Sequence, residues 1–338
     1  MHMKSADLTV LYKALYRELA AHGRGEALFG SCGDLALDAF GSAAVGPRMP
    51  TVYFEIPLLG EPRFDLQVCV SREDGAVERE LPVTALPQLE PLMDWLQRSE
   101  DCPGVDLAFD VGAGDVRSPQ VMALMTDGVL RDVAGFFAAA GDGQAAKRFV
   151  RRTRHVPLGW RIWYVGLAPQ RAGRPVRLDY SVGPRRQRRY LEDMALFAKD
   201  LLSLGYQSSE EQLGWCRQLM ELPFGPNLQL DVLEDDSMGP VLGYSLCMPS
   251  WAPAKSSESL RQGDLRQARE LLQAWGLVDD RWRELAGCCI GREIVVPVGK
   301  GASAFALRCV PTFLKVRMTA QGLLDAKAYL MCDIVALT

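Results

Sequence analysis

The residues best suited to do chemistry lie near the C-terminus, on two expected strands. The stretch "FLKVRMTAQGLLDAKAYLM", Phe313 to Met331, reads as two strands joined by a turn. Lys315 and Arg317 are two apart on the first strand, and Lys327 and Tyr329 are two apart on the second. Because a strand sends residues i and i+2 to the same face, each strand presents a cation to one face, and the second adds a phenol. Such a face can compensate negative charge on a ligand and shield positive charge beside it.

Two further strand-like runs place cations beside aromatic residues. Arg161 and Trp163 are two apart in "WRIWYV", and Arg177 opens the run "RLDYSV". Tyr244 on another run would join the aromatic side chains at the same face. The alternative for each is ordinary, since a lone Lys or Arg on a strand is usually solvated and a lone Tyr or Trp usually belongs to the core.

A carboxylate also sits in an expected strand. The run "TVYFEIPLL" puts Glu55 among apolar residues. It faces either a polar interior or the solvent, because an unsatisfied buried carboxylate is costly. In a polar interior, burial would raise its pKa and make Glu55 a general base that accepts a proton near neutral pH. Asp65 and Asp231 are further candidates of the same kind.

The order of elements indicates how these residues are positioned. Two strand-like runs flank a turn signal five times, and helical patterns separate them. The five hairpins are expected at 51–70, 105–125, 160–182, 227–248 and 313–331, and the helices at 86–98, 129–148, 187–204, 210–222 and 264–286. "REIVVPV" and "AFALRCV" are expected to add strand before the last hairpin.

Repeated hairpin–helix units predict an α/β fold with a closed barrel of about ten antiparallel strands, surrounded by helices. Hairpins make antiparallel sheets, and a sheet of that size tends to close because closure removes its edges. A barrel this wide encloses a chamber, which permits polar side chains on its inner face. The whole chain, 1–338, would be one domain. The alternative is two α+β domains with open sheets, divided near Arg185–Tyr190.

Composition limits the classes of partner. The chain has 338 residues, of which 48% are hydrophobic, and a net charge of −4, which does not favour nucleic acid. No uninterrupted apolar run is long enough to span a membrane, and the N-terminus does not read as a signal peptide. The nine Cys form no CxxC pair and indicate a reduced, cytoplasmic protein. With three His, a His-rich metal site is not expected.

Five hairpins alternating with helices, together with the C-terminal "KAYL", resemble the ABBA aromatic prenyltransferases, which share a fold called the PT-barrel. Chain length and the short last hairpin are most similar to the cyanobactin-type peptide prenyltransferases. The resemblance covers the element order over most of the chain and short motifs, but no long identical run.

The resemblance implies transfer of an isoprenoid from an allylic diphosphate (dimethylallyl or geranyl) to a peptide side chain or a small aromatic acceptor. Glu55 would take the acceptor proton. It implies no firmly held cofactor and leaves open whether Mg²⁺ accompanies the diphosphate. Diphosphate ligands would be Arg161, Arg177, Lys315, Arg317 and Lys327, and the aromatic shield of the allylic cation would be Trp163, Tyr244 and Tyr329.

A basic segment supports a second hypothesis. From Lys147 to Tyr190 there are 13 Lys or Arg residues and one acid, Asp179. The ordinary explanation is a solvated helix end and a hairpin turn. Alternatively, the segment binds an acidic peptide, which we favour over nucleic acid because the rest of the chain is acidic. The protein would then be a non-catalytic peptide-binding module, and its strand cations would face outward from a solid core.

Overall fold

The computed structural model describes residues 5–30, 51–71, 87–110, 115–125, 130–248, 253–298 and 301–337. Eleven strands lie in these ranges. In chain order they are β1 (Thr51–Pro57), β2 (Asp65–Ser71), β3 (Gly104–Asp110), β4 (Asp115–Leu124), β5 (Trp160–Leu167), β6 (Val176–Val182), β7 (Gly225–Val232), β8 (Leu242–Cys247), β9 (Ile290–Val298), β10 (Gly301–Thr319) and β11 (Gly322–Ala336).

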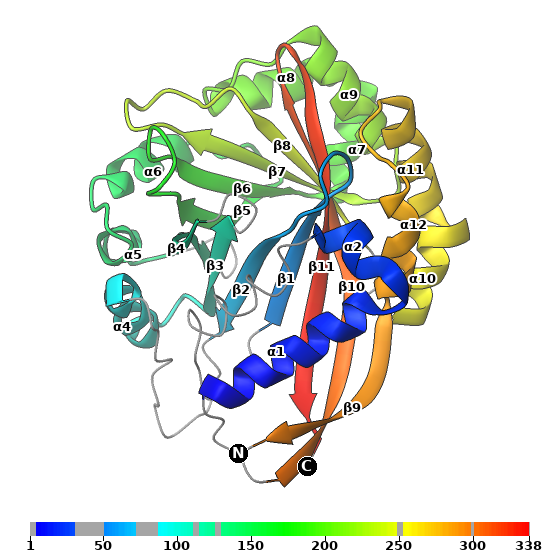
Figure 1. Cartoon of the computed structure of the whole chain (residues 1–338). Coiled ribbons are helices and arrows are strands. Elements are labelled where there is room, and N and C mark those ends of the chain that lie inside the picture. The colour runs from blue at the N-terminus through cyan, green and yellow to red at the C-terminus, as the bar shows by residue number, and fades with distance from the viewer. Residues whose placement is uncertain are drawn as a thin grey trace.

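These strands form a closed antiparallel barrel (Figure 1). Each of the first seven strands pairs with the next, β8 pairs with β10, and β10 pairs with β11. The ring closes because β11 also pairs with β1, so that of the eleven described strands only β9 lies outside it. The five hairpins and the barrel predicted from the sequence are confirmed. Two separate sheets divided near Arg185–Tyr190 are not, because the strands on either side of that segment, β6 and β7, pair directly.

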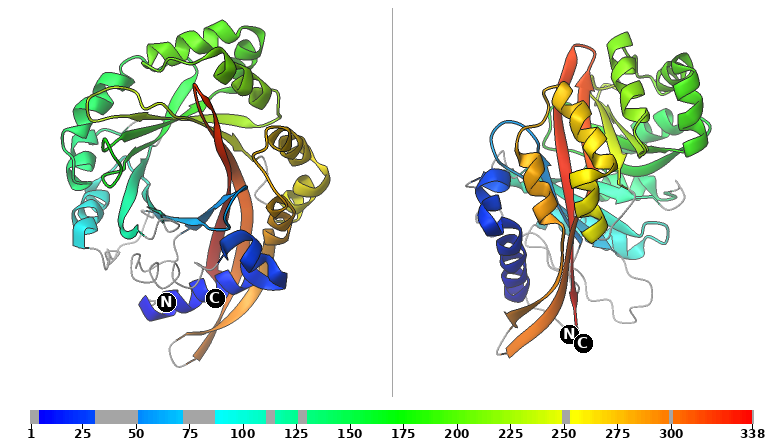
Figure 2. Two further views of the ribbon diagram at one scale, coloured as in Figure 1. Left: turned by 45° about the horizontal axis from the view of Figure 1, so that its top comes forward. Right: turned by 90° about the vertical axis from the view of Figure 1, so that its right-hand side faces the viewer.

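Helices cover the outside of the barrel (Figure 2). None of the described helices is both long and apolar enough to cross a membrane. The α-helices are α1 (Ser5–Ala20), α2 (Arg24–Phe29), α4 (Glu90–Arg98), α5 (Val133–Ala139), α6 (Ala145–Thr153), α7 (Pro184–Glu192), α8 (Met194–Ser203), α9 (Glu210–Met220), α10 (Pro253–Gln262), α11 (Asp264–Ala274) and α12 (Arg281–Leu285). Short 3-10 helices are η1 (Ala21–Gly23), η3 (Pro87–Leu89) and η5 (Ala286–Cys288).

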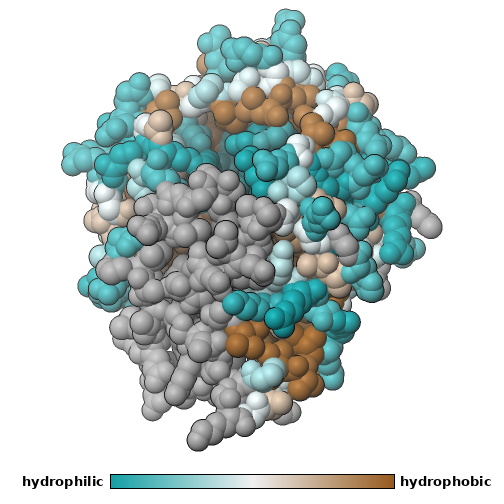
Figure 3. Space-filling model, in the orientation of Figure 1, coloured by the Kyte–Doolittle hydropathy of each residue, from teal (hydrophilic) through white to brown (hydrophobic). Residues whose placement is uncertain are grey.

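Strand alternation separates an apolar layer from a polar lumen. On β6, Val176, Leu178 and Tyr180 are fully buried beneath the helices, while the intervening Arg177 and Asp179 line the inside of the barrel. Each buried aliphatic side chain contributes about 1.5–3 kcal/mol. The apolar layer between strands and helices therefore stabilises the fold without filling the lumen. The described surface of the face in Figure 3 is hydrophilic over much of the helical rim, as this layering requires.

The last two strands of the barrel are its longest. β10 has 19 residues and β11 has 15, and the first part of β10 pairs with β9 on its free side. The expected "REIVVPV" strand is β9. The expected "AFALRCV" strand is continuous with the strand that carries Lys315, so both belong to β10.

A buried polar network ties α7 and α8 to β5. Trp160 Nε1 donates to the Tyr190 hydroxyl at 2.6 Å, and Arg186 Nε donates to the same oxygen at 3.0 Å. Tyr190 and Arg186 both donate to Oδ2 of Asp200, a buried carboxylate on α8. The Asp200 carboxylate on α8 therefore accepts from two donors on α7, and Tyr190 links this pair to Trp160 on β5.

We expect Asp200→Ala to lower the free energy of unfolding by about 1–3 kcal/mol, because it leaves the buried Tyr190 hydroxyl without its acceptor and the part-buried Arg186 without its ion-pair partner. Urea denaturation followed by circular dichroism measures the change. Glu221→Ala is the matched control, since it removes an exposed i,i+4 pair with Arg217; such a pair contributes about 0.5 kcal/mol. Equal losses in the two variants would contradict the role of the network.

Candidate active site

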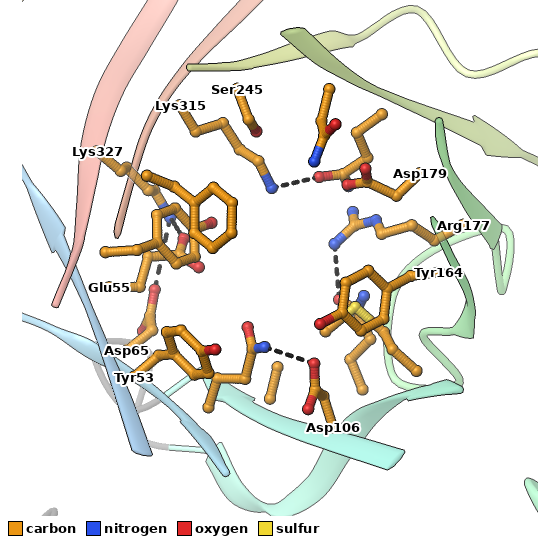
Figure 4. Close-up of a pocket in the computed structure, with 18 of the residues that line it drawn as sticks. Tyr53, Glu55, Asp65, Asp106, Tyr164, Arg177, Asp179, Ser245, Lys315 and Lys327 are labelled. Carbon is orange, nitrogen blue, oxygen red and sulfur yellow. Dashed lines mark hydrogen bonds and ion pairs between the residues drawn. The ribbon is translucent and has the colours of Figure 1, made fainter. Parts of the chain in front are cut away.

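A cavity of about 110 Å³ lies inside the barrel. By the same measure one water molecule needs roughly 10–15 Å³, so the cavity has room for a ligand that replaces several waters. All ten strands of the ring contribute side chains to its lining. Figure 4 shows these side chains converging from opposite walls, with Lys315 and Asp106 on facing sides.

Cations predicted from the last hairpin do line this cavity. Lys315 and Lys327 are directly opposite each other on β10 and β11. Lys327 Nζ forms an ion pair with Glu55 and lies 3.6 Å from Asp65 Oδ2. Arg317 lies in the same lining and pairs with Asp325 on the opposite strand. The i, i+2 spacing therefore brings the cations to one face, and carboxylates come with them.

Arg177 enters the cavity from β6. Its Nε and Nη2 donate to the two oxygens of Asp231 at 2.9 and 3.0 Å, and its Nη1 donates to Gln120 Oε1 at 2.8 Å. Gly166 is the cross-strand neighbour of Arg177 on β5, between it and β4. A Cβ at Gly166 would lie 2.7 Å from Met122 Cγ, so a glycine there lets β5 pack closely against the Met122 side chain on β4.

Lys315 differs from its neighbours in having a neutral hydrogen-bond partner. Its Nζ donates to Gln229 Oε1 at 2.6 Å and lies 5.2 Å from the centre of the Tyr329 ring. Burial lowers the pKa of Lys315, and the attraction of Asp179 and Glu55 offsets this only in part. Lys315 is thus a desolvated cation whose hydrogen-bonding capacity is not taken up by a carboxylate.

The aromatic residues fall into two groups. Tyr329 lines the cavity beside Phe313, with ring centres 6.2 Å apart, and Trp163 lines it beside Tyr164, also at 6.2 Å. A register shift on β5 between Ile162 and Tyr164 lets the adjacent Trp163 and Tyr164 both face inward. These are the side chains that can shield a cation.

Two predicted site residues are not brought to this cavity. Tyr244 is fully buried, but on β8 it is Ser245 that lines the lumen, so alternation directs Tyr244 into the apolar layer under the helices. Its place in the aromatic shield is therefore corrected. Arg161 is exposed at the N-terminal end of β5 and does not line the cavity.

Glu55 lies in the lumen as predicted, but its predicted raised pKa is wrong. Burial acts to raise the pKa, yet Lys327 and Lys315 outweigh burial and hold the pKa of the carboxyl well below its usual range. A hydrogen bond from Tyr329 adds to this effect. Glu55 is therefore an ion-paired carboxylate, and a weak base at neutral pH.

Asp106, which the sequence reasoning missed, has the properties expected of the base. Its side chain is 1% exposed, and Gln67 Nε2 donates to its Oδ2 at 2.8 Å. Burial raises the pKa of Asp106 to about 6, against the lowering effect of hydrogen bonds from Cys69, Tyr164 and Gln67. An acid in "VDLAFDV", between apolar Val105 and Leu107, was the signal that could have identified it.

Asp179 is a second missed carboxylate, on the same strand as Arg177. Burial raises its pKa to about 6 although Lys315 and Arg177 act to lower it. Its Oδ1 is buried and accepts no hydrogen bond from any residue that the structure describes. The same signal, an acid alternating with apolar residues in "VRLDYSV", was present in the sequence.

The described lining carries equal numbers of basic and acidic groups. With every group ionised its formal charge is zero, and with Asp106 and Asp179 protonated it is +2. The basic residues are Arg171, Arg177, Lys315, Arg317 and Lys327, and the acidic ones are Glu55, Asp65, Asp106, Asp110 and Asp179. The attraction of the lumen for an anion thus depends on protonation of its carboxylates.

Residues of the basic segment are divided among several roles. Arg148 pairs with Asp142, and Arg151 pairs with Asp236. Arg177 lies in the lumen. Exposed arginines remain at three positions of α7, namely Arg185, Arg188 and Arg189. The segment is therefore not one continuous surface.

No three His, Cys, Asp or Glu side chains among the described residues come together as a metal site. In comparisons with known proteins, the chain matches no protein-family model and no curated sequence. Membership of the ABBA family remains a prediction.

Proposed function

We propose that the protein transfers an isoprenoid from an allylic diphosphate to an acceptor bound in the barrel. The observation that carries the proposal is the lumen itself: cations and aromatic side chains from several strands line it, and Asp106, a carboxylate suited to act as a base, lies across it from Lys315 (Figure 4). The hairpin–helix order of the ABBA prenyltransferases, which the chain resembles, supports the same reaction.

In the proposed reaction Lys315, Arg177 and Lys327 hold the diphosphate. When the allylic C–O bond breaks, its electron pair leaves with the diphosphate, and these cations stabilise the added negative charge. Tyr329 and Trp163 lie where their rings can face the allylic cation. The barrel wall limits access of water, which would otherwise capture that cation.

Acceptor attack completes the transfer. A nucleophilic atom of the acceptor forms a bond to the allylic carbon and loses a proton, which Asp106 accepts. With a pKa of about 6, Asp106 is ionised at neutral pH and basic enough to take that proton. The acceptor class is a peptide side chain or a small aromatic compound, and Trp163, 44% exposed, offers such a group a ring to stack on.

The decisive experiment is mass spectrometry of candidate peptides and aromatic compounds incubated with allylic diphosphates of five, ten and fifteen carbons. The expected result is a mass increase of one isoprenoid unit. Titration calorimetry with an unreactive thiolodiphosphate analogue tests the donor site separately. No product together with no binding of any analogue would overturn the proposal.

The exposed arginines of α7 favour a second candidate, a non-catalytic module that binds an acidic peptide. Replacing Arg185, Arg188 and Arg189 by serine separates the two functions. A module would lose binding of a fluorescent polyglutamate peptide and would not bind the thiolodiphosphate analogue at any pH, whereas a transferase would retain analogue binding.

A further inference from the structure

Asp179 occupies a position that conflicts with an anion site unless it is neutral. It projects into the lumen beside Lys315 and Arg177, two of the proposed diphosphate ligands (Figure 4). An ionised carboxylate at this position would repel a diphosphate, whereas a protonated one would offer it a hydrogen bond. The protonation state of Asp179 therefore decides whether it opposes or assists binding.

The groups around Asp179 do not remove this conflict. No ion pair to Asp179 is formed by the described residues, and its buried Oδ1 accepts no hydrogen bond from them. Its cross-strand neighbour on β7, Gln229, is uncharged and bonds to Lys315. Titratable or charged groups face Asp179 from each packed element, namely Arg177 on its own strand, Tyr164 on β5, Asp231 on β7, Cys247 on β8 and Lys315 on β10.

Of the two cations, Arg177 is already committed to Asp231 through two hydrogen bonds. Lys315 bonds to a neutral amide and has no such commitment. A polyanion that approaches Lys315 must therefore come close to Asp179 as well. Its ionised phosphate oxygens accept hydrogen bonds and donate none, so they complement only the protonated carboxyl.

We infer that the anion site takes up a diphosphate together with a proton, and that Asp179 holds this proton and donates it in a hydrogen bond to a phosphate oxygen. The inference rests on the diphosphate ligand proposed above and goes beyond it, because it makes binding proton-coupled. No bond to phosphorus or carbon changes in this step. The proton comes from solvent and returns to it when the diphosphate leaves.

The pH dependence follows from this placement. Burial already raises the pKa of Asp179 to about 6, and a bound polyanion raises it further. Below about pH 6 the free protein is already protonated at Asp179 and binds without proton uptake. Above about pH 6 each diphosphate must bring a proton with it, so the affinity falls by up to about tenfold per pH unit. Diphosphate affinity is therefore expected to be highest under mildly acidic conditions.

Titration calorimetry with inorganic pyrophosphate tests the inference. At about pH 7.5, repeating the titration in buffers of different ionisation enthalpy counts the protons taken up on binding. The wild-type protein is expected to take up about one proton more per pyrophosphate than Asp179→Asn, which is neutral at every pH. Ionisation of pyrophosphate itself contributes equally to both and cancels in the difference.

Asp106→Asn is the matched control, because Asp106 has a similar pKa but lies across the lumen. It is expected to keep the proton uptake of the wild type. Equal uptake in the wild type and Asp179→Asn would overturn the inference, as would loss of the extra proton in Asp106→Asn instead. Those two outcomes would leave the anion site of the proposed function intact. Absence of pyrophosphate binding to the wild type at about pH 5.5 would instead overturn both the inference and that anion site.

Discussion

Asp106→Asn is expected to lower turnover roughly 10²–10⁴-fold, the usual contribution of a positioned general base. Asparagine has nearly the same shape as aspartate but cannot accept a proton from the acceptor. Binding of the thiolodiphosphate analogue should change little, because Asp106 lies across the lumen from Lys315 (Figure 4). Single-turnover mass spectrometry measures the rate, and titration calorimetry measures the binding.

Glu55→Gln is the comparison that makes this result specific. Its carboxylate is tied to Lys327, so its loss is expected to disturb diphosphate binding more than proton transfer. Lys327 would then still have Asp65 nearby, 3.6 Å away. If Glu55→Gln abolished turnover with intact analogue binding while Asp106→Asn did not, the base would be Glu55 and not Asp106.

The two carboxyls with raised pKa predict a bell-shaped pH profile for turnover. Asp106 must be ionised to act as a base, so activity falls as pH drops below about 6. Asp179 must be protonated to accept the diphosphate, so activity falls as pH rises above its pKa in the complex. Asp106→Asn should remove the acidic limb and Asp179→Asn the alkaline limb. The free protein gives both carboxyls a pKa of about 6, and it is the bound diphosphate, which lies beside Asp179, that raises the pKa of Asp179 above that of Asp106.

The barrel could be predicted because the alternation of residue types along each strand indicates which face of the strand is buried. In "VLGYSLC", Leu242, Tyr244 and Leu246 alternate with small residues, and the structure buries all three. That pattern already indicated that Tyr244 belongs to the apolar layer. Because Tyr244 shares its face with Leu242 and Leu246, it belongs to the apolar layer, and its predicted place in the lumen is wrong.

Cross-strand partners could not be predicted from local patterns. Glu55 and Lys327 are 272 residues apart, and their ion pair exists because β11 returns to close the ring against β1. That pair reverses the expected direction of the pKa shift of Glu55. The register shift on β5 that lets Trp163 and Tyr164 both face inward likewise has no marker in "WRIWYV". Many of the residues that line the lumen could therefore be predicted from the sequence. Their pKa shifts could not, because these depend on closure of the barrel.

The second large effect is expected for Lys315→Met, which keeps the length of the side chain and removes its charge. Loss of one contact to a leaving group typically costs about 2.7–4 kcal/mol at the transition state, or roughly 10²–10³-fold in rate. Binding of the thiolodiphosphate analogue should weaken as well. Arg317→Met is the control, because Arg317 is part-exposed and already paired with Asp325. Its replacement should change rate and binding less.

Lys315→Met should also make the protein more stable at neutral pH. Because burial lowers the pKa of Lys315, its charged form is less favourable in the folded chain than in the unfolded chain. For a base whose folded pKa is depressed, stability is lost as pH falls below the unfolded pKa. Removing the charge therefore raises the free energy of unfolding at pH 7, provided that Gln229 can rotate away from the methionine. Thermal denaturation at neutral and alkaline pH measures this difference, which should shrink as pH rises.

A buried cation that weakens the fold yet holds the ligand is expected of a functional site. A variant with lower stability and unchanged analogue binding would instead make Lys315 a structural residue, and the cation wall of the lumen would lose its proposed role.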